Sequence, residues 1–248
     1  MLFEKESGST FVAFQTADVP LHPWAVEVET IGKVRTDHQV VAESDRIRFS
    51  PFEVSFDLSR ACKCGLKISA LSEVETHWVQ ARMPLIESAL QAERRSRPPD
   101  PFQPQIDAIL EQWRETGDSA ELAHLLGLGS GSTPSGDDVL VGLLAGLTAL
   151  EAVSREAAER LRCLRRALQT NMRQRTTQPS RQMIEAACDS SFSEPVLRLF
   201  QMLALAESRR NQIESATENV LALGALSGAA IVSGLVAASV PGSTSYLR

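Results

Sequence analysis

The stretch GLGSGSTPSGDD, residues 127–138, separates two helical patterns and differs in composition from both. Four glycines, three serines, a threonine and a proline lead into the adjacent acids Asp137 and Asp138. The segment that follows, VLVGLLAGLTALEAV, is apolar on every side, which is typical of a buried helix. Gly142 and Gly146 would let a neighbouring backbone approach closely. We therefore expect the loop to lead into a helix at the centre of the fold.

The pattern recurs near the end of the chain. Residues 135–145 read SGDDVLVGLLA and residues 227–237 read SGAAIVSGLVA. We interpret this repeat as two helix–Gly loop–helix units that face each other in one α-helical domain. Ala229 and Ala230 replace the two aspartates in the second copy, so we expect any chemistry to lie in the first.

The last uncharged run, about twenty residues after Asn219, has the length of a membrane span. The motif LGALSG interrupts this run, and its many Gly, Ala and Ser residues suit close packing between helices. We therefore expect a packed helix and no membrane partner.

The first 71 residues show the short, alternating Val-, Ile- and Phe-rich segments of strands, punctuated by Pro and Gly. We expect a small antiparallel β-sheet or barrel over residues 1–71. Ser72 and Glu75 form a capping-box pattern, and the helix they open is expected to bend or break at Pro84. The fold class is then α+β, with an α-helical domain over residues 72–248 that carries the Gly-rich loop.

Composition excludes several function classes. The net charge of −6 gives no reason to expect nucleic-acid binding, and the N-terminus has acids where a signal peptide needs basic residues, so we expect a cytoplasmic protein. All four lysines lie at or before Lys67. The glycine loop is therefore no P-loop, which needs a lysine after its last glycine. A Schiff base in the C-terminal part is excluded for the same reason.

Some residues of the loop favour the binding of an anion, and others disfavour it. Thr133 or Ser135 could cap the following helix, with Pro134 in its first turn, and the free N–H groups of a helix start attract anions. The aspartates would repel an anion there. Either Mg²⁺ bridges carboxylate and phosphate, or the aspartates cap the helix or hold arginines. These alternatives stay open at this point.

Two further features of the sequence are explained without a functional site. Residues 155–181 hold eight arginines and two glutamates, which is more typical of a solvated helix face or of contacts with a partner's acids than of RNA binding. His124 precedes the loop, but Ser135 lacks the G-x-S-x-G context of a hydrolase serine.

The motif GLGSGSTPSGDDVLVGLLAGL resembles the signature of a bacterial family typified by the AllH-type subunit of oxamate carbamoyltransferase, with Ser132 in place of a leucine. TTQPS (residues 176–180) resembles a second family feature. GALSGAAIVSG resembles a third, in which Ala225 and Ala230 replace the usual His and Asp. The resemblance covers roughly the C-terminal half.

The resemblance implies phosphorolysis of oxalurate to oxamate and carbamoyl phosphate, in purine (allantoin) catabolism, by an assembly with other carbamoyltransferase subunits. It implies a small-molecule substrate and a homo- or hetero-oligomer; the alternative is a non-catalytic metabolite-binding or interface subunit. Asp137 and Asp138 would be catalytic, by binding a metal such as Mg²⁺ or by orienting an arginine. The remaining candidates, for phosphate or substrate binding, are Gly129, Gly131, Thr133, Ser135, Gly136, Arg175, Thr176, Thr177 and Ser180.

Overall fold

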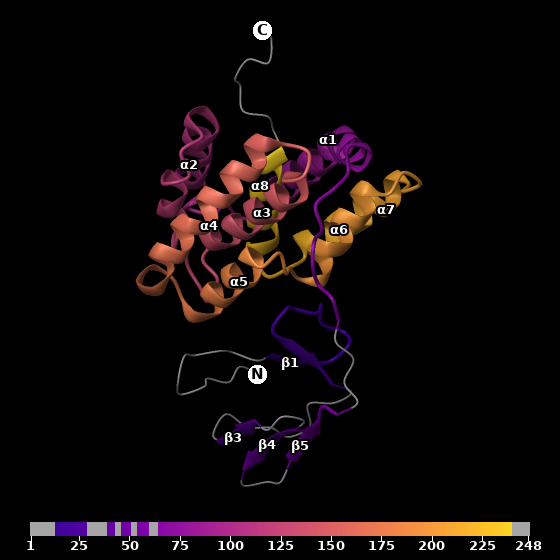
Figure 1. Cartoon of the computed structure of the whole chain (residues 1–248), viewed down its shortest axis with the longest axis vertical. Coiled ribbons are helices and arrows are strands. Elements are labelled where there is room, and N and C mark those ends of the chain that lie inside the picture. The colour runs from indigo at the N-terminus through magenta and orange to yellow at the C-terminus, as the bar shows by residue number, and fades with distance from the viewer. Residues whose placement is uncertain (1–12, 29–38, 43–45, 51–53, 60–63, 240–248) are drawn as a thin grey trace. The chain divides into compact units, whose positions relative to one another are not determined.

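The structure is a computed structural model, and it describes the chain except for residues 1–12, 29–38, 43–45, 51–53, 60–63 and 240–248 (Figure 1). The chain divides into two compact units, Met1–Leu66 and Lys67–Arg248. The first unit contains the strands and the second contains the helices, so each is described by itself below.

The strands of the first unit form two separate sheets. β1 (Ala13–Gln15) and β2 (Ala25–Glu27) pair in parallel, whereas β3 (Gln39–Ala42), β4 (Arg46–Ser50) and β5 (Val54–Asp57) form an antiparallel sheet in that order. The expected barrel is wrong for the described residues. A barrel needs an unbroken ring of paired strands, and here strands of three to five residues split between two sheets.

The second unit is helical. The capping box at the start of its first helix is confirmed, since the Glu75 N–H donates to the Ser72 hydroxyl and the Ser72 N–H donates to the Glu75 carboxylate. The helix continues across Pro84, so it does not break there, and the alternative of a bend stays a prediction. The helices are α1 (Glu73–Ser96), α2 (Gln103–Thr116), the 3₁₀ helix η1 (Glu121–Leu125), α3 (Ser135–Leu150), α4 (Arg155–Arg175), α5 (Gln178–Cys188), α6 (Glu194–Ala204), α7 (Arg210–Leu221) and α8 (Ser227–Ser239).

The centre of this unit is the pair α3 and α8, with the other helices around it (Figure 1). Every residue of α3 up to Ala149 is buried, as its apolar pattern predicts. A Cβ atom at Gly142 would lie 1.9 Å from the carbonyl oxygen of Ile231, and one at Gly234 would lie 2.0 Å from that of Val139. The two backbones are thus in direct contact, and glycine is required at both positions.

Both copies of the repeat therefore form helices, and these helices pack on each other. The segment before the first loop is a 3₁₀ helix of five residues rather than an α-helix. The interpretation as two equivalent helix–Gly loop–helix units stays a prediction. Among the described residues, no helix is long and apolar enough to cross a membrane.

Candidate functional site

Glycines shape the loop that precedes α3. Gly127 and Gly129 have positive φ angles of 73° and 134°, which residues with side chains rarely adopt. A Cβ atom at Gly127 would lie 2.0 Å from the carbonyl oxygen of Arg175, and one at Gly129 would lie 2.5 Å from the backbone nitrogen of Ser135. These two glycines let the loop fold tightly on neighbouring backbone, and a side chain at either position would clash with it.

The tip of the loop is different. Ser130, Gly131 and Ser132 are exposed, and a Cβ atom at Gly131 would meet no atom within 4 Å. Gly131 also has a positive φ angle of 88°. The tip is therefore exposed, and there is open space around Gly131.

The start of α3 has no side-chain cap. Pro134 is the N-cap residue and Ser135 is the first residue of the helix, where it is buried. The expectation that Thr133 or Ser135 caps the helix, with Pro134 in its first turn, is therefore wrong. The hydroxyl of Thr133 instead pairs with that of Ser227, at 3.1 Å.

Asp137 ties the loop to the junction of α4 and α5. Its carboxylate accepts hydrogen bonds from the N–H of Gly127, at 2.9 Å, and from the hydroxyl of Thr176. The side chain is buried, which raises the pKa of Asp137, while the hydrogen bonds from Thr176 and Gly127 and the nearby Ser180 hydroxyl, which does not meet hydrogen-bond geometry, act in the opposite direction. Asp137 thus holds three backbone segments together, and its partners are not arginines.

Asp138 has almost the opposite environment. It is 1% exposed, and neither carboxylate oxygen has a hydrogen-bond partner in the described part of the chain. Burial raises the pKa of Asp138 to about 8. The Ser227 hydroxyl lowers it in part without meeting hydrogen-bond geometry, and the charge of Asp137 raises it further. A buried polar group without partners is costly and calls for an explanation.

The donor set for a divalent cation is small. Among the described residues, no three His, Cys, Asp or Glu side chains come together as a metal-binding group. The oxygens of Asp137 already accept hydrogen bonds, so Asp138 is the aspartate with oxygens to offer. Mg²⁺ uses one or two carboxylates together with ligand phosphates, and only in that form would these residues suit it.

Three helix starts meet at the loop. Thr177 is the N-cap of α5, and its hydroxyl donates a hydrogen bond to the carbonyl of Ser132. The same hydroxyl accepts a hydrogen bond from the N–H of Ser180, at 3.3 Å. The Thr133–Ser227 pair joins the loop to the first residue of α8. α3, α5 and α8 therefore all begin here, and each helix start carries a partial positive charge.

The structure brings most of the candidate residues together. Thr133, Asp137, Thr176 and Thr177 are linked to the loop or to one another by the contacts above. Ser180 is fully buried, and its hydroxyl oxygen has no hydrogen-bond partner in the part of the chain that is described. Ser135 and Gly136 lie buried at the start of α3, and Gly129 and Gly131 lie in the loop itself.

Arg175 is placed beside the loop by its backbone, while its side chain is exposed. His124 is exposed and has no hydrogen bond to Ser135 in the described structure, so nothing pairs the two as base and nucleophile. Ser227 is the site residue that we did not predict. It occupies the repeat position of Ser135, and the alanines beside it made the second copy look inert.

The two alanines of the third motif border a hollow of their own. Ala225 and Ala230 line a hollow of about 120 Å³ together with Arg94 and Arg97. Arg97 donates to the carbonyl oxygen of Ala225, and Arg94 donates to the Ser233 hydroxyl at 2.9 Å. Arg94 of α1 and Arg97, which follows that helix, therefore border the two positions at which the family motif has His and Asp.

Comparison with known proteins gives one match. Residues 125–239, just under half of the chain, match the model of a family described as "Oxamate carbamoyltransferase subunit AllH". The curated proteins and the solved structures gave no match. The matched range begins at the last residue of η1 and ends with α8, so it contains the loop and all three helix starts. Over these residues, the chain is similar to the AllH family.

Proposed function

We propose that this chain is a subunit of an oxamate carbamoyltransferase-like enzyme, which converts oxalurate and phosphate into oxamate and carbamoyl phosphate. In this proposal the loop at residues 127–138 binds a phosphate- or carbamoyl-bearing small molecule. The observation that carries the proposal is the meeting of three helix starts at an exposed loop tip. Helix N-termini carry a partial positive charge that favours anions, and three of them act in the same direction here.

The reaction needs a held phosphate and a stabilised charge on the carbamoyl group. Backbone N–H groups of the loop, the hydroxyls of Thr133, Thr177 and Ser180, and the positive helix ends are suited to this, because they are fixed before the ligand arrives. Arg175 and Arg181 flank the TTQPS motif (residues 176–180) in sequence and would add positive charge and bidentate hydrogen bonds.

The two aspartates would have separate roles. Asp137 would keep the loop, Thr176 and the start of α3 in register, as its two hydrogen bonds suggest. Asp138 would lie beside Ser227 and the bound ligand. It would act there either as a neutral acid or as a ligand of a Mg²⁺ ion shared with the phosphate. Both roles explain why its oxygens have no hydrogen-bond partner in the described structure.

The alternative is a non-catalytic subunit whose loop binds a metabolite or supports an interface. The alanines at positions 225 and 230 favour it, since the third motif then lacks its acid–base pair. The exposed position of His124 favours it as well. In this reading another chain of the assembly supplies the reacting groups.

Calorimetric titration of the full chain with inorganic phosphate and with carbamoyl phosphate, each with and without Mg²⁺, tests the proposal. The test variant is Asp138→Asn, and the matched control is Asp107→Asn on the exposed face of α2. We expect saturable binding of at least one anion to the unaltered chain and to the control.

The outcomes separate the two roles of Asp138. Binding that needs Mg²⁺ and disappears in Asp138→Asn makes this aspartate a metal ligand. Binding without metal that survives or tightens in the variant makes it a neutral group beside an anion site. If neither anion binds under any condition, the loop site is wrong. Carbamoyl phosphate formation from oxalurate with the partner subunits present then decides between the enzyme and the non-catalytic subunit.

A further inference from the structure

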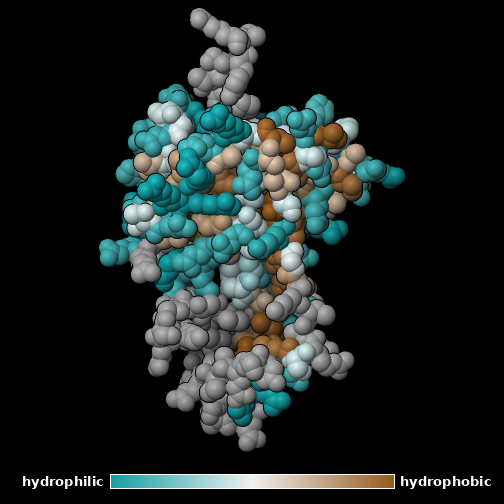
Figure 2. Space-filling view, viewed as in Figure 1, coloured by the Kyte–Doolittle hydropathy of each residue, from teal (hydrophilic) through white to brown (hydrophobic). Residues whose placement is uncertain are grey.

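One face of α4 carries arginines that the fold does not use. The apolar side of this helix packs inward through Ala157, Leu161, Leu164 and Leu168. Arg155, Arg162 and Arg166 are exposed on the opposite side, and Arg165 lies half-buried beside them. We call these four arginines the basic face. Hydrophilic residues cover much of the surface over this helix in Figure 2.

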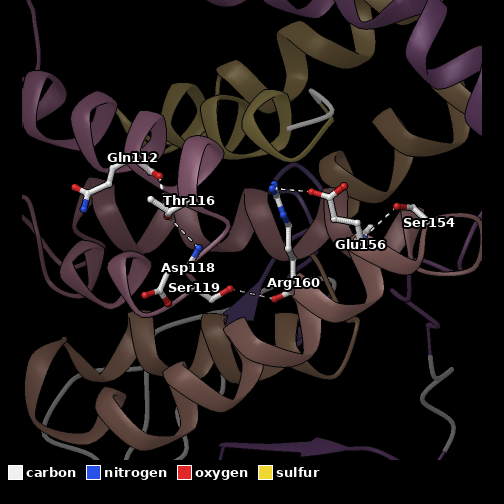
Figure 3. A network of polar contacts seen from close by, with 8 residues as sticks. Gln112, Thr116, Asp118, Ser119, Ser154, Glu156 and Arg160 are labelled. Atoms are coloured by element: carbon white, nitrogen blue, oxygen red, sulfur yellow. Dashed lines mark hydrogen bonds and ion pairs between the residues drawn. The ribbon is translucent and has the colours of Figure 1, made fainter. Parts of the chain in front are cut away.

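A fifth arginine of the same helix, Arg160, has a structural role. The guanidinium of Arg160 lies 4.8 Å from the ring centre of the buried Trp113 and pairs with Glu156 at 2.7 Å. The backbone carbonyl of Arg160 accepts a hydrogen bond from Ser119 (Figure 3). Arg160 thus fastens α4 to the end of α2, and it is excluded from the basic face.

The basic face has few such partners. Arg162 pairs with Glu159, but both side chains are well exposed, and such pairs contribute little. Within the described residues, Arg155 and Arg166 have no carboxylate at ion-pair distance. Arg165 donates to the Ser190 hydroxyl at 3.1 Å, whereas its Nε atom is buried without a hydrogen-bond partner in the described structure.

The surface beside these arginines is hollowed. A hollow of about 490 Å³ is lined by three of the four arginines, with Leu161 and Ala158 at its base and Glu151 and Gln169 beside them. Three guanidiniums therefore line this hollow, with Glu151 in the same lining and Glu159 paired with Arg162. The chain as a whole has a net charge of −6, so this positive surface stands out.

We propose that the basic face docks a row of carboxylates on another protein chain. Arg155 and Arg166 are eleven residues apart, or about 16 Å along the helix, which matches an extended surface better than a single small anion. Guanidinium groups form paired hydrogen bonds with carboxylates, and the hollow leaves room for side chains to reach them. The face has no aromatic residue on which bases could stack, and this disfavours a single-stranded nucleic acid.

This inference concerns a surface outside the loop site and does not depend on the ligand proposed there. A fluorescent poly-L-glutamate peptide serves as the probe, and its binding to the full chain is followed by anisotropy at increasing salt. The test variant is Arg162→Gln/Arg165→Gln/Arg166→Gln. The control is Arg198→Gln/Arg209→Gln/Arg210→Gln, which removes the same charge from exposed positions in α6, at the N-cap of α7 and in its first turn.

We expect binding that weakens with salt, and a loss of roughly tenfold or more in affinity for the test variant but not for the control. Equal losses in both variants would show a general charge effect and would overturn the proposal. Single-stranded poly-uridine or anionic phospholipid vesicles that bind the basic face more tightly than poly-glutamate would overturn the assignment to a protein partner. Absence of any poly-glutamate binding at low salt would overturn it as well.

Discussion

At the scale of single residues, the buried acid Asp138 is the feature with the strongest physical consequence. Its oxygens have no hydrogen-bond donor in the described structure, and burial raises its pKa from the ordinary value of 3.8 to about 8. The folded protein therefore holds a proton at neutral pH that the unfolded chain releases. A group of this kind makes folding proton-linked.

The sign of the linkage follows directly. Between pH 3.8 and about 8 the folded state binds more protons than the unfolded state, so the free energy of unfolding falls as the pH rises through this window. The slope from this one group is at most about 1.4 kcal/mol per pH unit. Above about 8 both states are ionised, and the contribution becomes constant.

We predict that Asp138→Asn removes most of this dependence and raises stability at slightly alkaline pH by about 1–3 kcal/mol, because an amide carries no desolvated charge. Urea denaturation of both proteins at about pH 6 and about pH 8 checks the prediction, with the exposed Asp107→Asn as control. A variant that keeps the pH slope of the unaltered chain would show that Asp138 is ionised in the folded state.

Residue-level patterns predicted the site only in part. The resemblance identified Thr176 and Thr177 as site residues, and both make contacts with the loop. The predicted cap was wrong because the Thr133 hydroxyl pairs with the Ser227 hydroxyl instead of accepting from an N–H group of the helix start. That contact joins positions 94 residues apart in the chain, and no local pattern encodes such a distance.

At the scale of elements, the fold rests on the contact between α3 and α8. Here the sequence was informative: the repeated glycines predicted a close approach of backbones, and the structure has it. The carbonyl oxygen of Ile231 occupies the place of a side chain at Gly142. A methyl group would have to push the two helices apart, and a packed interior resists such a shift.

We predict that Gly142→Ala lowers the free energy of unfolding by at least about 1–3 kcal/mol, the usual cost of overpacking, despite the higher helix propensity of alanine. Gly65→Ala is the control, because a Cβ atom at Gly65 would meet nothing within 4 Å. Thermal unfolding followed by circular dichroism compares the two. Equal midpoints would mean that α3 and α8 separate easily, contrary to the contact described above.

Other elements were predicted less well, for physical reasons. Pro84 removes one helical hydrogen bond, but the buried residues around it, including Met83 and Ile86, hold α1 together across it. The strands of the first unit were found by their alternation, whereas their division into two sheets depends on pairing between strands. Short strands specify that pairing weakly, which is why a barrel looked equally reasonable.

At the scale of the whole molecule, the family match begins only after the first two helices. Residues 125–239 contain the loop and α3 to α8, whereas α1 and α2 lie before them. The helical unit nevertheless includes both parts, so contacts must join α1 to the matched range. Arg82 makes the most concentrated of these contacts.

Arg82 lies in α1 and is 9% exposed, with its guanidinium 5.1 Å from the ring centre of Trp78. It donates hydrogen bonds to backbone carbonyls at the junction of α6 and α7. The acceptors, with their distances from the guanidinium nitrogens, are Met202 at 3.3 Å, Leu203 at 2.7 Å, Leu205 at 2.7 Å, Ala206 at 3.0 Å and Ser208 at 3.4 Å. A single cation thus satisfies the carbonyl end of α6 and the turn that follows it.

We predict that Arg82→Met costs about 2–5 kcal/mol, because several partly buried carbonyls lose their donor while the apolar bulk is kept. Arg95→Met, at an exposed position of the same helix, is the matched control and is expected to change stability by no more than about 0.5 kcal/mol. Urea denaturation measures both, and hydrogen exchange at residues 202–208 localises the effect. If Arg82→Met lost stability without faster exchange in this turn, Arg82 would act through its packing on Trp78 rather than through the carbonyls.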